Sequence, residues 1–355
     1  MGRHDASGSG SPLLRVEDLT ISFGRGPSRF EAVRGVSLSV DEGEIHTLVG
    51  ESGAGKTVTA RAVPGLSAGA ARIDGGRIHY RDTELTSLGE EDLRRLRGVE
   101  IGMIFQDPGR HLNPSLSVGR QISEGLEEHY GISRGAARLR ALRLAKLVEL
   151  ADPRRVLRSY PHQLSGGMKQ RALIAMAISC GPGLLIADEP TTALDATVQG
   201  QILALLRRLR DRLGMGILFV SHDFAVVQAV ADRVSVMYAG KIVETAPAER
   251  LFAEPLHPYT DLLLSAIPEA EKRGERLRSV PGRAPEPRER PSGCPFHPRC
   301  PLAREKCRRE DPPLLTHASD HLSACHFADE LRRDGSHDRP AAGLKGTDEP
   351  GGADV

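Results

Sequence analysis

The sequence predicts an α/β protein in which short apolar strands alternate with helices in a layered fold. Between Leu13 and about Ala266, strand-like apolar runs alternate with helical patterns, which is the order typical of such folds. A glycine-rich pattern at residues 50–57 lies between a strand and a helix, the context that a phosphate-binding loop needs. The chain has 355 residues, of which 39% are hydrophobic and 27% charged, so it can bury a large core.

Five strands and five helices are predicted in this region from the length and spacing of the apolar runs. The predicted strands are Glu44–Val49, Ile101–Phe105, Leu184–Ala187, Ile217–Ser221 and Val234–Tyr238. The predicted helices are Lys56–Ala62, Ala136–Glu149, Gly167–Ile178, Val198–Leu213 and Phe224–Ala231. No internal repeat is visible, so we expect one copy of the main domain in the chain.

Composition divides the chain into five segments. Residues 1–12 are polar and rich in Gly and Ser, which predicts a disordered leader, and residues 13–266 form the main domain. Residues 267–292 are rich in Pro, Arg and Glu and are expected to form a linker. A cysteine-containing C-terminal extension follows at residues 293–328, and residues 329–355 are expected to form a disordered tail.

The overall charge argues against some classes of partner. Lys and Arg number 48 and Asp and Glu 47, a net charge of +1, whereas nucleic-acid binding needs a clustered basic surface. No apolar run approaches the roughly 18 residues that a membrane-spanning helix needs. The first residues lack the apolar segment of a secretory signal. We therefore expect a protein that stays inside the cell and serves a membrane, if at all, from its surface.

The strongest local pattern is the phosphate loop. Its glycines allow the backbone to wrap with N–H groups pointing inward, and the following helix N-terminus adds partial positive charge. Lys56 is expected to reach the β- and γ-phosphates, and the Thr57 hydroxyl to ligate Mg²⁺. The alternative is a glycine-rich turn that happens to carry a lysine, which the flanking strand and helix disfavour. The loop consists of Gly50, Glu51, Ser52, Gly53, Ala54, Gly55, Lys56 and Thr57.

A second element is the pair of carboxylates, Asp188 and Glu189, that ends the apolar strand at 184–187. Charges at the edge of a core are costly unless they are paired or bound to metal. We expect Asp188 to hold Mg²⁺ through water and Glu189 to polarise the attacking water as a general base. The alternative is an acidic pair that caps a helix before Pro190.

Residues 164–170, Leu-Ser-Gly-Gly-Met-Lys-Gln, resemble the signature of ABC-transporter ATPases and lie upstream of the Asp188–Glu189 strand, as in that family. Alone, Ser-Gly-Gly is a flexible turn, but here it is one of seven ordered elements. The others are the phosphate loop, the acidic strand end, Gln106, Asp195, the Ser221–Asp223 triplet and the aromatic residue Phe23. The resemblance covers about residues 13–266. It implies a P-loop NTPase, ABC-type nucleotide-binding domain with a RecA-like core, an antiparallel β subdomain and an α-helical subdomain.

The resemblance implies a role for each of these residues, with ATP and Mg²⁺ as ligands. Phe23 would stack on adenine, although an aromatic at a strand end is also a candidate for the core. Gln106 would contact Mg²⁺ or the attacking water, and it begins the segment that faces the membrane subunit. His222 would hydrogen-bond the γ-phosphate, and Asp195 belongs to a loop that crosses to the partner subunit.

The resemblance also implies a quaternary arrangement. Each ATP would be sandwiched between the phosphate loop of one subunit and Ser165, Gly166 and Gly167 of another, so one chain cannot complete a site alone. The helix N-terminus after Ser165 directs backbone N–H groups at phosphate. ATP would then hold two nucleotide domains together and hydrolysis would release them, a movement that membrane partners convert into work.

Several segments resemble the ATPase subunits of oligopeptide and dipeptide importers, whose relatives also carry nickel. They are Gln106–Pro108, Leu112–Pro114, residues 188–199, Leu256–Thr260 and the extension from Gly293 to Cys300. His111 departs from the small residue usual there, beside the expected membrane-subunit contact.

The subfamily implies an ATP-hydrolysing subunit at the cytoplasmic face of the inner membrane that energises peptide uptake. Its partners would be a second, different ATPase subunit, two transmembrane permease subunits and an extracytoplasmic solute-binding protein, and no nucleic acid. The alternatives are transport of nickel or another small solute, a soluble non-transport ABC ATPase, and a regulatory module that holds ATP without turnover.

The cysteines of the extension need a separate explanation. Their spacing lacks the Cys-x2–4-Cys opening usual for structural zinc sites, so we expect a [4Fe–4S] cluster that braces the extension. Arg299 and Arg308 are expected to help offset the charge of that cluster. Zinc, with His297 or His326 as a further ligand, is the alternative, and free thiols and a disulfide remain open. The four residues are Cys294, Cys300, Cys307 and Cys325.

Overall fold

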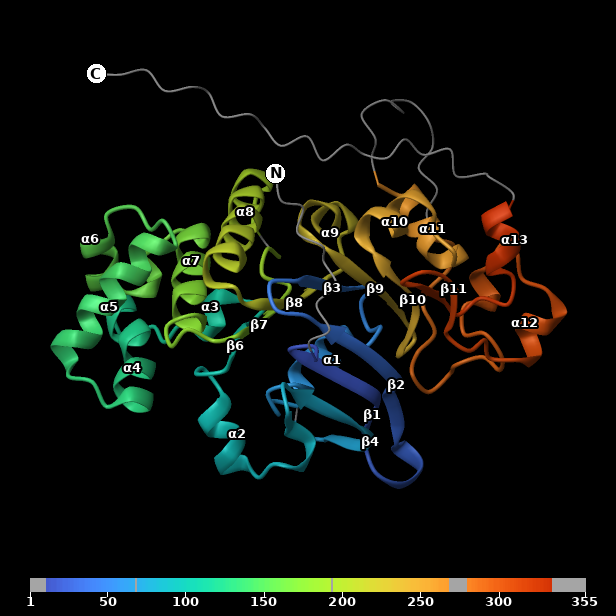
Figure 1. Cartoon of the computed structure of the whole chain (residues 1–355), viewed down its shortest axis with the longest axis horizontal. Coiled ribbons are helices and arrows are strands. Elements are labelled where there is room, and N and C mark those ends of the chain that lie inside the picture. The colour runs from blue at the N-terminus through green and yellow to red at the C-terminus, as the bar shows by residue number, and fades with distance from the viewer. Residues whose placement is uncertain (1–10, 68, 193, 268–279, 334–355) are drawn as a thin grey trace, which may run out of the picture.

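The computed structural model describes residues 11–67, 69–192, 194–267 and 280–333. The first ten residues of the expected leader, residues 268–279 of the expected linker and residues 334–355 of the expected tail lie outside the described residues. The described chain forms two sheets and a lateral group of helices (Figure 1). Among these described residues, no helix combines the length and the apolar character that crossing a membrane requires.

The larger sheet has eight strands in the order β11-β12-β10-β9-β3-β8-β7-β6. Its five neighbouring strands from β9 to β6 run parallel, and they are the five strands predicted from the sequence, each within one residue at either end. Every residue of β3, β7 and β8 is buried, as expected of parallel strands covered on both faces. The bounds are β3 Ile45–Val49, β6 Ile101–Ile104, β7 Leu184–Asp188, β8 Gly216–Ser221 and β9 Arg233–Tyr238.

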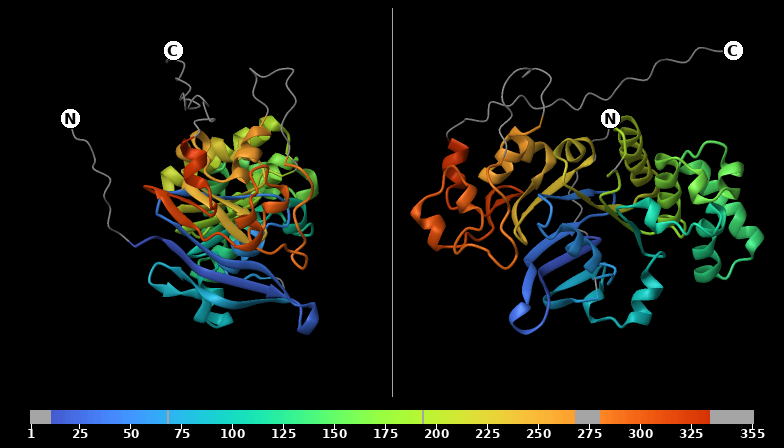
Figure 2. Two further views of the ribbon diagram at one scale, coloured as in Figure 1. Left: turned by 90° about the vertical axis from the view of Figure 1, so that its right-hand side faces the viewer. Right: turned by 180° about the vertical axis from the view of Figure 1, so that it is seen from behind.

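The smaller sheet is antiparallel, with the order β2-β1-β4-β5, and confirms the β subdomain that the resemblance implies. It lies against one face of the larger sheet, with α1 (Lys56–Ala62) between them (Figures 1 and 2). Buried side chains of both sheets and of α1 form one apolar cluster. The strands are β1 Leu14–Phe23, β2 Phe30–Val40, β4 Ala71–Tyr80 and β5 Thr83–Glu84.

Helices α4 to α7 form the lateral helical region (Figure 1). Helix α1 has the predicted bounds, and α5, α7, α8 and α9 lie within two residues of the predicted helices. Helix α4 was not predicted, although its buried Val118, Ile122 and Leu126 recur every four residues and Ser117 caps its start. The helices are α2 Glu90–Leu96, α3 Pro108–His111, α4 Val118–Tyr130, α5 Arg134–Leu147, α6 Pro153–Arg158, α7 Gly166–Ala177, α8 Ala196–Leu213 and α9 Phe224–Val230.

The C-terminal extension continues the larger sheet. Strand β12 (His321–Ser323) pairs antiparallel with β10 (Lys241–Pro247), which in turn pairs with β9. The buried Glu244 carboxylate on β10 accepts hydrogen bonds from the backbone N–H groups of Leu256 and His257 and lies 2.8 Å from His321 Nε2. The remaining elements are α10 Ala248–Ala253, α11 Pro258–Ser265, α12 Glu305–Arg309, β11 Leu315–Ala318 and α13 Ala328–Arg333, with short 3-10 helices at Gly26–Ser28, Leu85–Ser87, Pro161–Gln163 and His297–Arg299.

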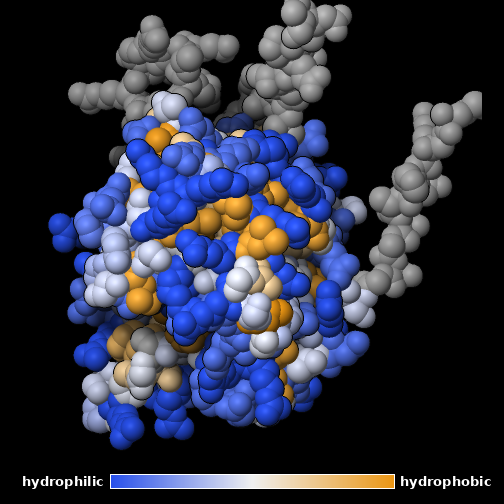
Figure 3. Space-filling view, turned by 90° about the vertical axis from the view of Figure 1, so that its left-hand side faces the viewer, coloured by the Kyte–Doolittle hydropathy of each residue, from blue (hydrophilic) through white to orange (hydrophobic). Residues whose placement is uncertain are grey.

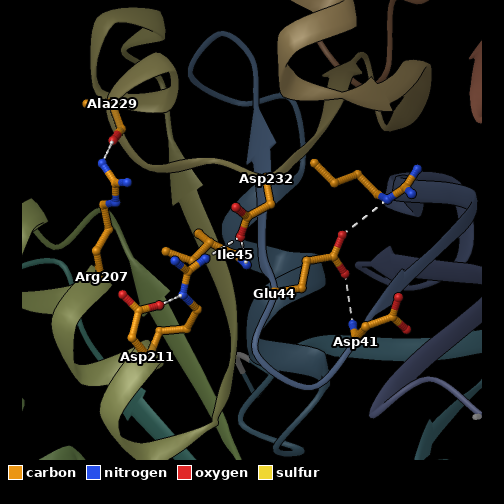
Figure 4. A network of polar contacts seen from close by, with 9 residues as sticks. Asp41, Glu44, Ile45, Arg207, Asp211, Ala229 and Asp232 are labelled. Atoms are coloured by element: carbon orange, nitrogen blue, oxygen red, sulfur yellow. Dashed lines mark hydrogen bonds and ion pairs between the residues drawn. The ribbon is translucent and has the colours of Figure 1, made fainter. Parts of the chain in front are cut away.

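A polar network braces the amino ends of the parallel strands (Figure 4). Asp232 Oδ2 accepts from Ile45 N at 2.8 Å and from Arg210 Nη1 at 2.6 Å, so it joins β3 to α8. Glu44 accepts from Asp41 N at 2.8 Å and from Arg233 Nε at 3.2 Å. Burial raises the pKa of the Glu44 carboxyl, and these donors counter the shift. The carboxylates of Asp232 and Glu44 therefore each accept hydrogen bonds from an arginine and from a backbone N–H.

Candidate functional site

The phosphate loop follows the carboxyl end of β3 and leads into α1. Gly50 and Gly55 have φ angles of 154° and 105°, which other residues rarely adopt. A Cβ on Gly50 would lie 2.1 Å from the carbonyl oxygen of Met237, and one on Gly55 would lie 2.8 Å from that of Ala32. Both positions therefore require glycine. Ser52 and Gly53 are exposed at the tip of the loop, whereas Ala54 is buried.

Lys56 curls back over the loop that it follows. Its ammonium donates to the carbonyl oxygens of Gly50 at 2.7 Å and Glu51 at 3.0 Å, and the residue is only 4% exposed. Burial lowers the pKa of this ammonium, and the carboxylates of Glu189, Asp188 and Glu51 counter the shift. The loop thus holds a buried cation beside its inward-facing backbone, where a phosphate anion would be stabilised.

Asp188 ends β7 next to the start of α1. Thr57 Oγ1 donates to Asp188 Oδ1 at 2.8 Å, and the Arg61 guanidinium donates to Asp188 Oδ2 at 3.3 Å. Burial raises the pKa of the Asp188 carboxyl, and the bonds from Thr57 and Arg61 counter the shift. A hydroxyl and a carboxylate in contact beside the loop are the hard oxygen ligands that Mg²⁺ prefers, so the residues fit this ion.

Glu189 brings together the ends of three neighbouring strands. Its carboxylate accepts from Gln106 Nε2 at 2.9 Å and Thr192 Oγ1 at 3.0 Å, and lies 3.2 Å from His222 Nδ1. Gln106 follows β6, Glu189 follows β7 and His222 follows β8. Glu189 has a left-handed φ of 48°, an uncommon conformation for a residue other than glycine. The structure therefore brings together the three residues expected to act on the attacking water, Mg²⁺ and the γ-phosphate. Sequence reasoning missed Thr192, whose position three residues after Glu189 was the available signal.

The Ser-Gly-Gly motif begins α7 in the helical region, apart from the phosphate loop at the start of α1 (Figure 1). Ser165 caps this helix by accepting a hydrogen bond from Met168 N, and Ser165 and Gly166 are exposed. Gly167 packs where a Cβ would lie 2.7 Å from Val198 Cγ1. Asp195 likewise caps α8, accepting from Val198 N at 2.9 Å.

Phe23 is the last residue of β1. Its ring stacks on that of Phe30, with centroids 5.8 Å apart and planes inclined by 16°, and the two residues are cross-strand partners. Phe23 is partly buried against the apolar cluster of the two sheets. It therefore has a core contact and retains some exposed surface.

The four cysteines of the extension line one small cavity. None of them forms a disulfide. Burial raises the pKa of the Cys294 thiol to about 11 and of the Cys325 thiol to about 12, so both are neutral at pH 7. Three histidines on this cavity have a ring nitrogen at backbone: His297 Nδ1 lies 3.0 Å from Cys294 O, His326 Nε2 lies 3.0 Å from Glu310 O, and His257 Nδ1 accepts from Tyr259 N at 3.1 Å. Within the described part of the chain, no group of three or more His, Cys, Asp or Glu residues is arranged to hold a metal ion.

Arg299 contacts a different partner from the one expected. Its guanidinium makes two hydrogen bonds to the Glu51 carboxylate of the phosphate loop, at 2.6 and 2.8 Å. The extension thus reaches the nucleotide site, a contact that sequence reasoning missed because the two residues are 248 positions apart.

Family comparison identifies two regions of the chain. Residues 33–192 match the ABC transporter family, and residues 243–307 match the C-terminal region of oligopeptide/dipeptide transporters. The chain is 46% identical to the dipeptide transport ATP-binding protein DppD of Escherichia coli (strain K12), over 89% of this chain and 96% of that protein. It is 45% identical to the oligopeptide transport ATP-binding protein AppD of Bacillus subtilis (strain 168), over 90% and 98%. A putative peptide import ATP-binding protein of Brucella abortus (strain 2308) is 48% identical, over 89% and 95%.

Solved structures agree with the fold. A dimeric bacterial ABC transporter cassette, MJ0796, superposes with a TM-score of 0.60 at 28% identity, over 66% of this chain and 99% of that chain. The protein cbiO1 from Clostridium perfringens, part of the ABC transporter complex cbiONQ, superposes with a TM-score of 0.59 at 27% identity, over 68% of this chain and 91% of that chain.

Proposed function

This chain belongs to the ABC transporter ATP-binding proteins of oligopeptide and dipeptide import, and from that premise we propose how its residues hydrolyse ATP and which subunits it works with. The chain is an ATPase that uses ATP and Mg²⁺ to energise peptide import. The observation that supports the proposed mechanism best is the convergence of Gln106, Glu189 and His222 beside the phosphate loop.

The phosphate loop and the residues at the strand ends have different roles in binding and hydrolysis. The loop backbone and Lys56 bind the triphosphate, and Thr57, Asp188 and Gln106 hold Mg²⁺, which neutralises phosphate charge when bound. Glu189 polarises the water that attacks the γ-phosphate, and Gln106 holds the Glu189 carboxylate in position. His222, which is half exposed next to Glu189, donates to the γ-phosphate.

The complete site needs a second subunit. Ser165, Gly166, Gly167 and Asp195 begin helices on a part of the molecule away from the loop that would bind the same ATP. A phosphate on the loop of one chain would therefore meet Ser165 of another, and the dimeric structure of the similar cassette MJ0796 supports a pair of subunits. Phe23 would stack on adenine at the edge of the site. We propose that the second subunit is a different ATPase of the same family.

The segment that begins at Gln106, together with the helical region against which its helix α3 packs, is the proposed contact with two transmembrane permease subunits. The helical region exposes Tyr130, Leu139 and Tyr160. Figure 3 views this side of the molecule and shows hydrophobic groups among hydrophilic ones. Apolar side chains with a polar surround are typical of a protein contact. The chain would then lie at the cytoplasmic face of the inner membrane, with an extracytoplasmic solute-binding protein on the other side.

We also propose that Cys294, Cys300, Cys307 and Cys325 hold a [4Fe–4S] cluster. Support comes from their common cavity and their lack of disulfides; the cavity would have to open for the cluster, and zinc is the alternative. Iron and sulfide near four each per chain in an anaerobic preparation would support the cluster. Stoichiometric zinc, or no metal, would contradict it.

Reconstitution tests the function itself. The chain, co-purified with its membrane partners and placed in proteoliposomes with a solute-binding protein, should take up a labelled dipeptide when ATP is present. Glu189→Gln should abolish that uptake. Uptake of Ni²⁺ without peptide would overturn the substrate class, and stable isolation with DNA or ribosomes instead of membrane proteins would overturn the transport role.

A further inference from the structure

We propose that Arg299 of the C-terminal extension is a positioning residue for the phosphate loop, which it holds through Glu51 in the shape that receives the triphosphate. The inference rests on the proposed binding of ATP at residues 50–57, and it assigns the extension a part in that binding. In contrast to a tail that only covers the domain, this extension contributes a side chain to the nucleotide site.

The first observation is the geometry of the ion pair. Arg299 Nη1 donates to Glu51 Oε2 at 2.6 Å and Nη2 donates to Glu51 Oε1 at 2.8 Å, which is the two-pronged arrangement that only a guanidinium can make. Its Nε donates to Pro281 O at 2.7 Å, and Nη1 also lies 3.2 Å from the hydroxyl of Tyr238. Because these bonds fix the guanidinium in its plane, they also fix the Glu51 carboxylate.

The second observation is the burial of the arginine. Only 6% of the Arg299 side chain is exposed, against 29% of the Glu51 side chain. The guanidinium lies 5.7 Å from the ring centroid of Tyr238 and 5.9 Å from that of Phe296. The ring of Tyr259 contacts both of these rings, with centroids 4.6 and 5.2 Å away. This aromatic group excludes water from the guanidinium, so the attraction between the two charges is stronger than at a surface.

The third observation is that Glu51 is held at three points. Its carboxylate meets Arg299, its backbone N–H donates to the Tyr259 hydroxyl at 3.0 Å, and its carbonyl oxygen accepts from Lys56 Nζ at 3.0 Å. Glu51 is the second residue of the loop, directly after Gly50. A shift of its side chain would therefore move the backbone that faces phosphate and the carbonyl that orients Lys56.

Arg299 is not needed to attach the extension to the domain. The pairing of β12 with β10 and the contact of His321 with the buried Glu244 already join the two. Another two-pronged ion pair joins Arg304 of the extension to Glu330 on α13, at 3.1 and 2.6 Å; it is half exposed and does not involve the loop. This second pair provides a matched control.

The kinetic signature follows from what the loop does. It binds the phosphates both before and during hydrolysis, so misplacing it weakens ground-state and transition-state binding together. Such a loss raises KM and leaves kcat nearly unchanged. A variant that merely unfolded part of the extension would instead reduce the active fraction, and so kcat, with KM constant.

The experiment is a double-mutant cycle in the full chain. Nucleotide affinity is measured with a fluorescent ATP analogue, and KM and kcat are measured in the assembled transporter. Arg299→Gln and Glu51→Gln should each raise KM by about 10-fold with kcat within about 2-fold, and the double variant should be no worse than the poorer single one. Arg299→Lys, which keeps the charge but loses the two-pronged geometry, should fall between the wild type and Arg299→Gln.

Arg304→Gln should leave KM unchanged. Additive effects of the two site variants, or a KM for Arg299→Gln equal to that of Arg304→Gln, would overturn the positioning role. If Arg299→Gln does not fold, Glu51→Gln and Arg299→Lys carry the test, and normal KM values in both would reject the proposal. Failure of the wild-type chain to bind ATP would reject the proposed function instead.

Discussion

The two ends of the parallel strands use carboxylates in opposite ways. At the amino ends, Asp232 and Glu44 are each met by an arginine and a backbone N–H, and the network joins β3, β9 and α8 (Figure 4). At the carboxyl ends, Glu189 accepts from the neutral side chains of Gln106 and Thr192 and lies next to His222, in a left-handed conformation. At the amino ends each carboxylate is paired with an arginine, whereas at the carboxyl ends the Glu189 carboxylate is oriented by an amide, a hydroxyl and a histidine.

This difference shows which end of the parallel strands carries the residues proposed to act on ATP. Asp232 and Glu44 are each engaged by an arginine and by a backbone N–H, so both carboxylates hold β3, β9 and α8 together. Glu189 is held by an amide and a hydroxyl next to the phosphate loop, which leaves its carboxylate oriented for the proposed reaction. The carboxyl ends of the strands show both arrangements. There Glu51 is paired with Arg299, which fixes its position, whereas Glu189 is the proposed base of the reaction.

The largest expected effect is at Glu189. Glu189→Gln keeps the shape and the hydrogen bonds but removes the base, so turnover of ATP should fall by about 10³-fold while ATP-driven dimerisation remains. Single-turnover kinetics and gel filtration with ATP would measure the two properties. Unchanged turnover would refute the assigned role.

The next effect is a pH dependence of the free energy of unfolding. It comes from a buried histidine on β3, which lies between the two ends of the parallel strands. Burial lowers the pKa of His46 to about 4, and the 1%-exposed ring lies between Ser39 O and Ser235 Oγ. The unfolded chain, with a histidine pKa near 6.5, binds the extra proton first. Stability is therefore greatest above about pH 6.5 and should lose on the order of 3 kcal/mol from this group as the pH falls toward 4.

Urea unfolding between pH 4 and 7 would measure this loss. The His46→Asn variant should show a shallower dependence, with the remainder coming from His257, whose pKa burial lowers to about 3. An equally steep dependence in the variant would show that His46 is not the responsible group.

A smaller effect is expected at the Mg²⁺ ligand. Thr57→Val removes the hydroxyl that contacts Asp188, so the Mg²⁺ concentration for half-maximal turnover should rise by about 10-fold or more. Thr59→Val is the matched control on the same helix, because Thr59 Oγ1 donates to the Gly55 carbonyl at 3.1 Å. The same shift of the Mg²⁺ dependence in both variants would argue against a ligand role for Thr57.

The smallest effect is expected for a substitution at the amino ends of the parallel strands. Asp232→Ala removes the acceptor of Ile45 N and the partner of Arg210, and should lower the free energy of unfolding by about 1–2 kcal/mol. Denaturant unfolding would measure the change. ATP turnover per folded molecule should stay within about 2-fold of the wild type, and a large loss of turnover would break the contrast between the two ends.

The sequence was most informative where burial is complete. The five parallel strands are short runs dominated by apolar residues, so their bounds were predictable to one residue. Strand β4 is mostly exposed and was implied only through the family resemblance. The phosphate loop and the Asp188–Glu189 pair were predictable because their chemistry is local in sequence. The contact of Arg299 with Glu51 was not, because it depends on how the extension folds back onto the domain.

The attachment of the extension at β10 has a practical meaning for anyone shortening this protein. A chain that stopped at residue 266 would lose β12, leaving β10 as a bare outer strand with unpaired N–H and C=O groups, and would strip His321 from the buried Glu244. Exposed strand edges recruit other chains and promote aggregation. We therefore expect a chain truncated at this point to aggregate and not to form a smaller soluble ATPase.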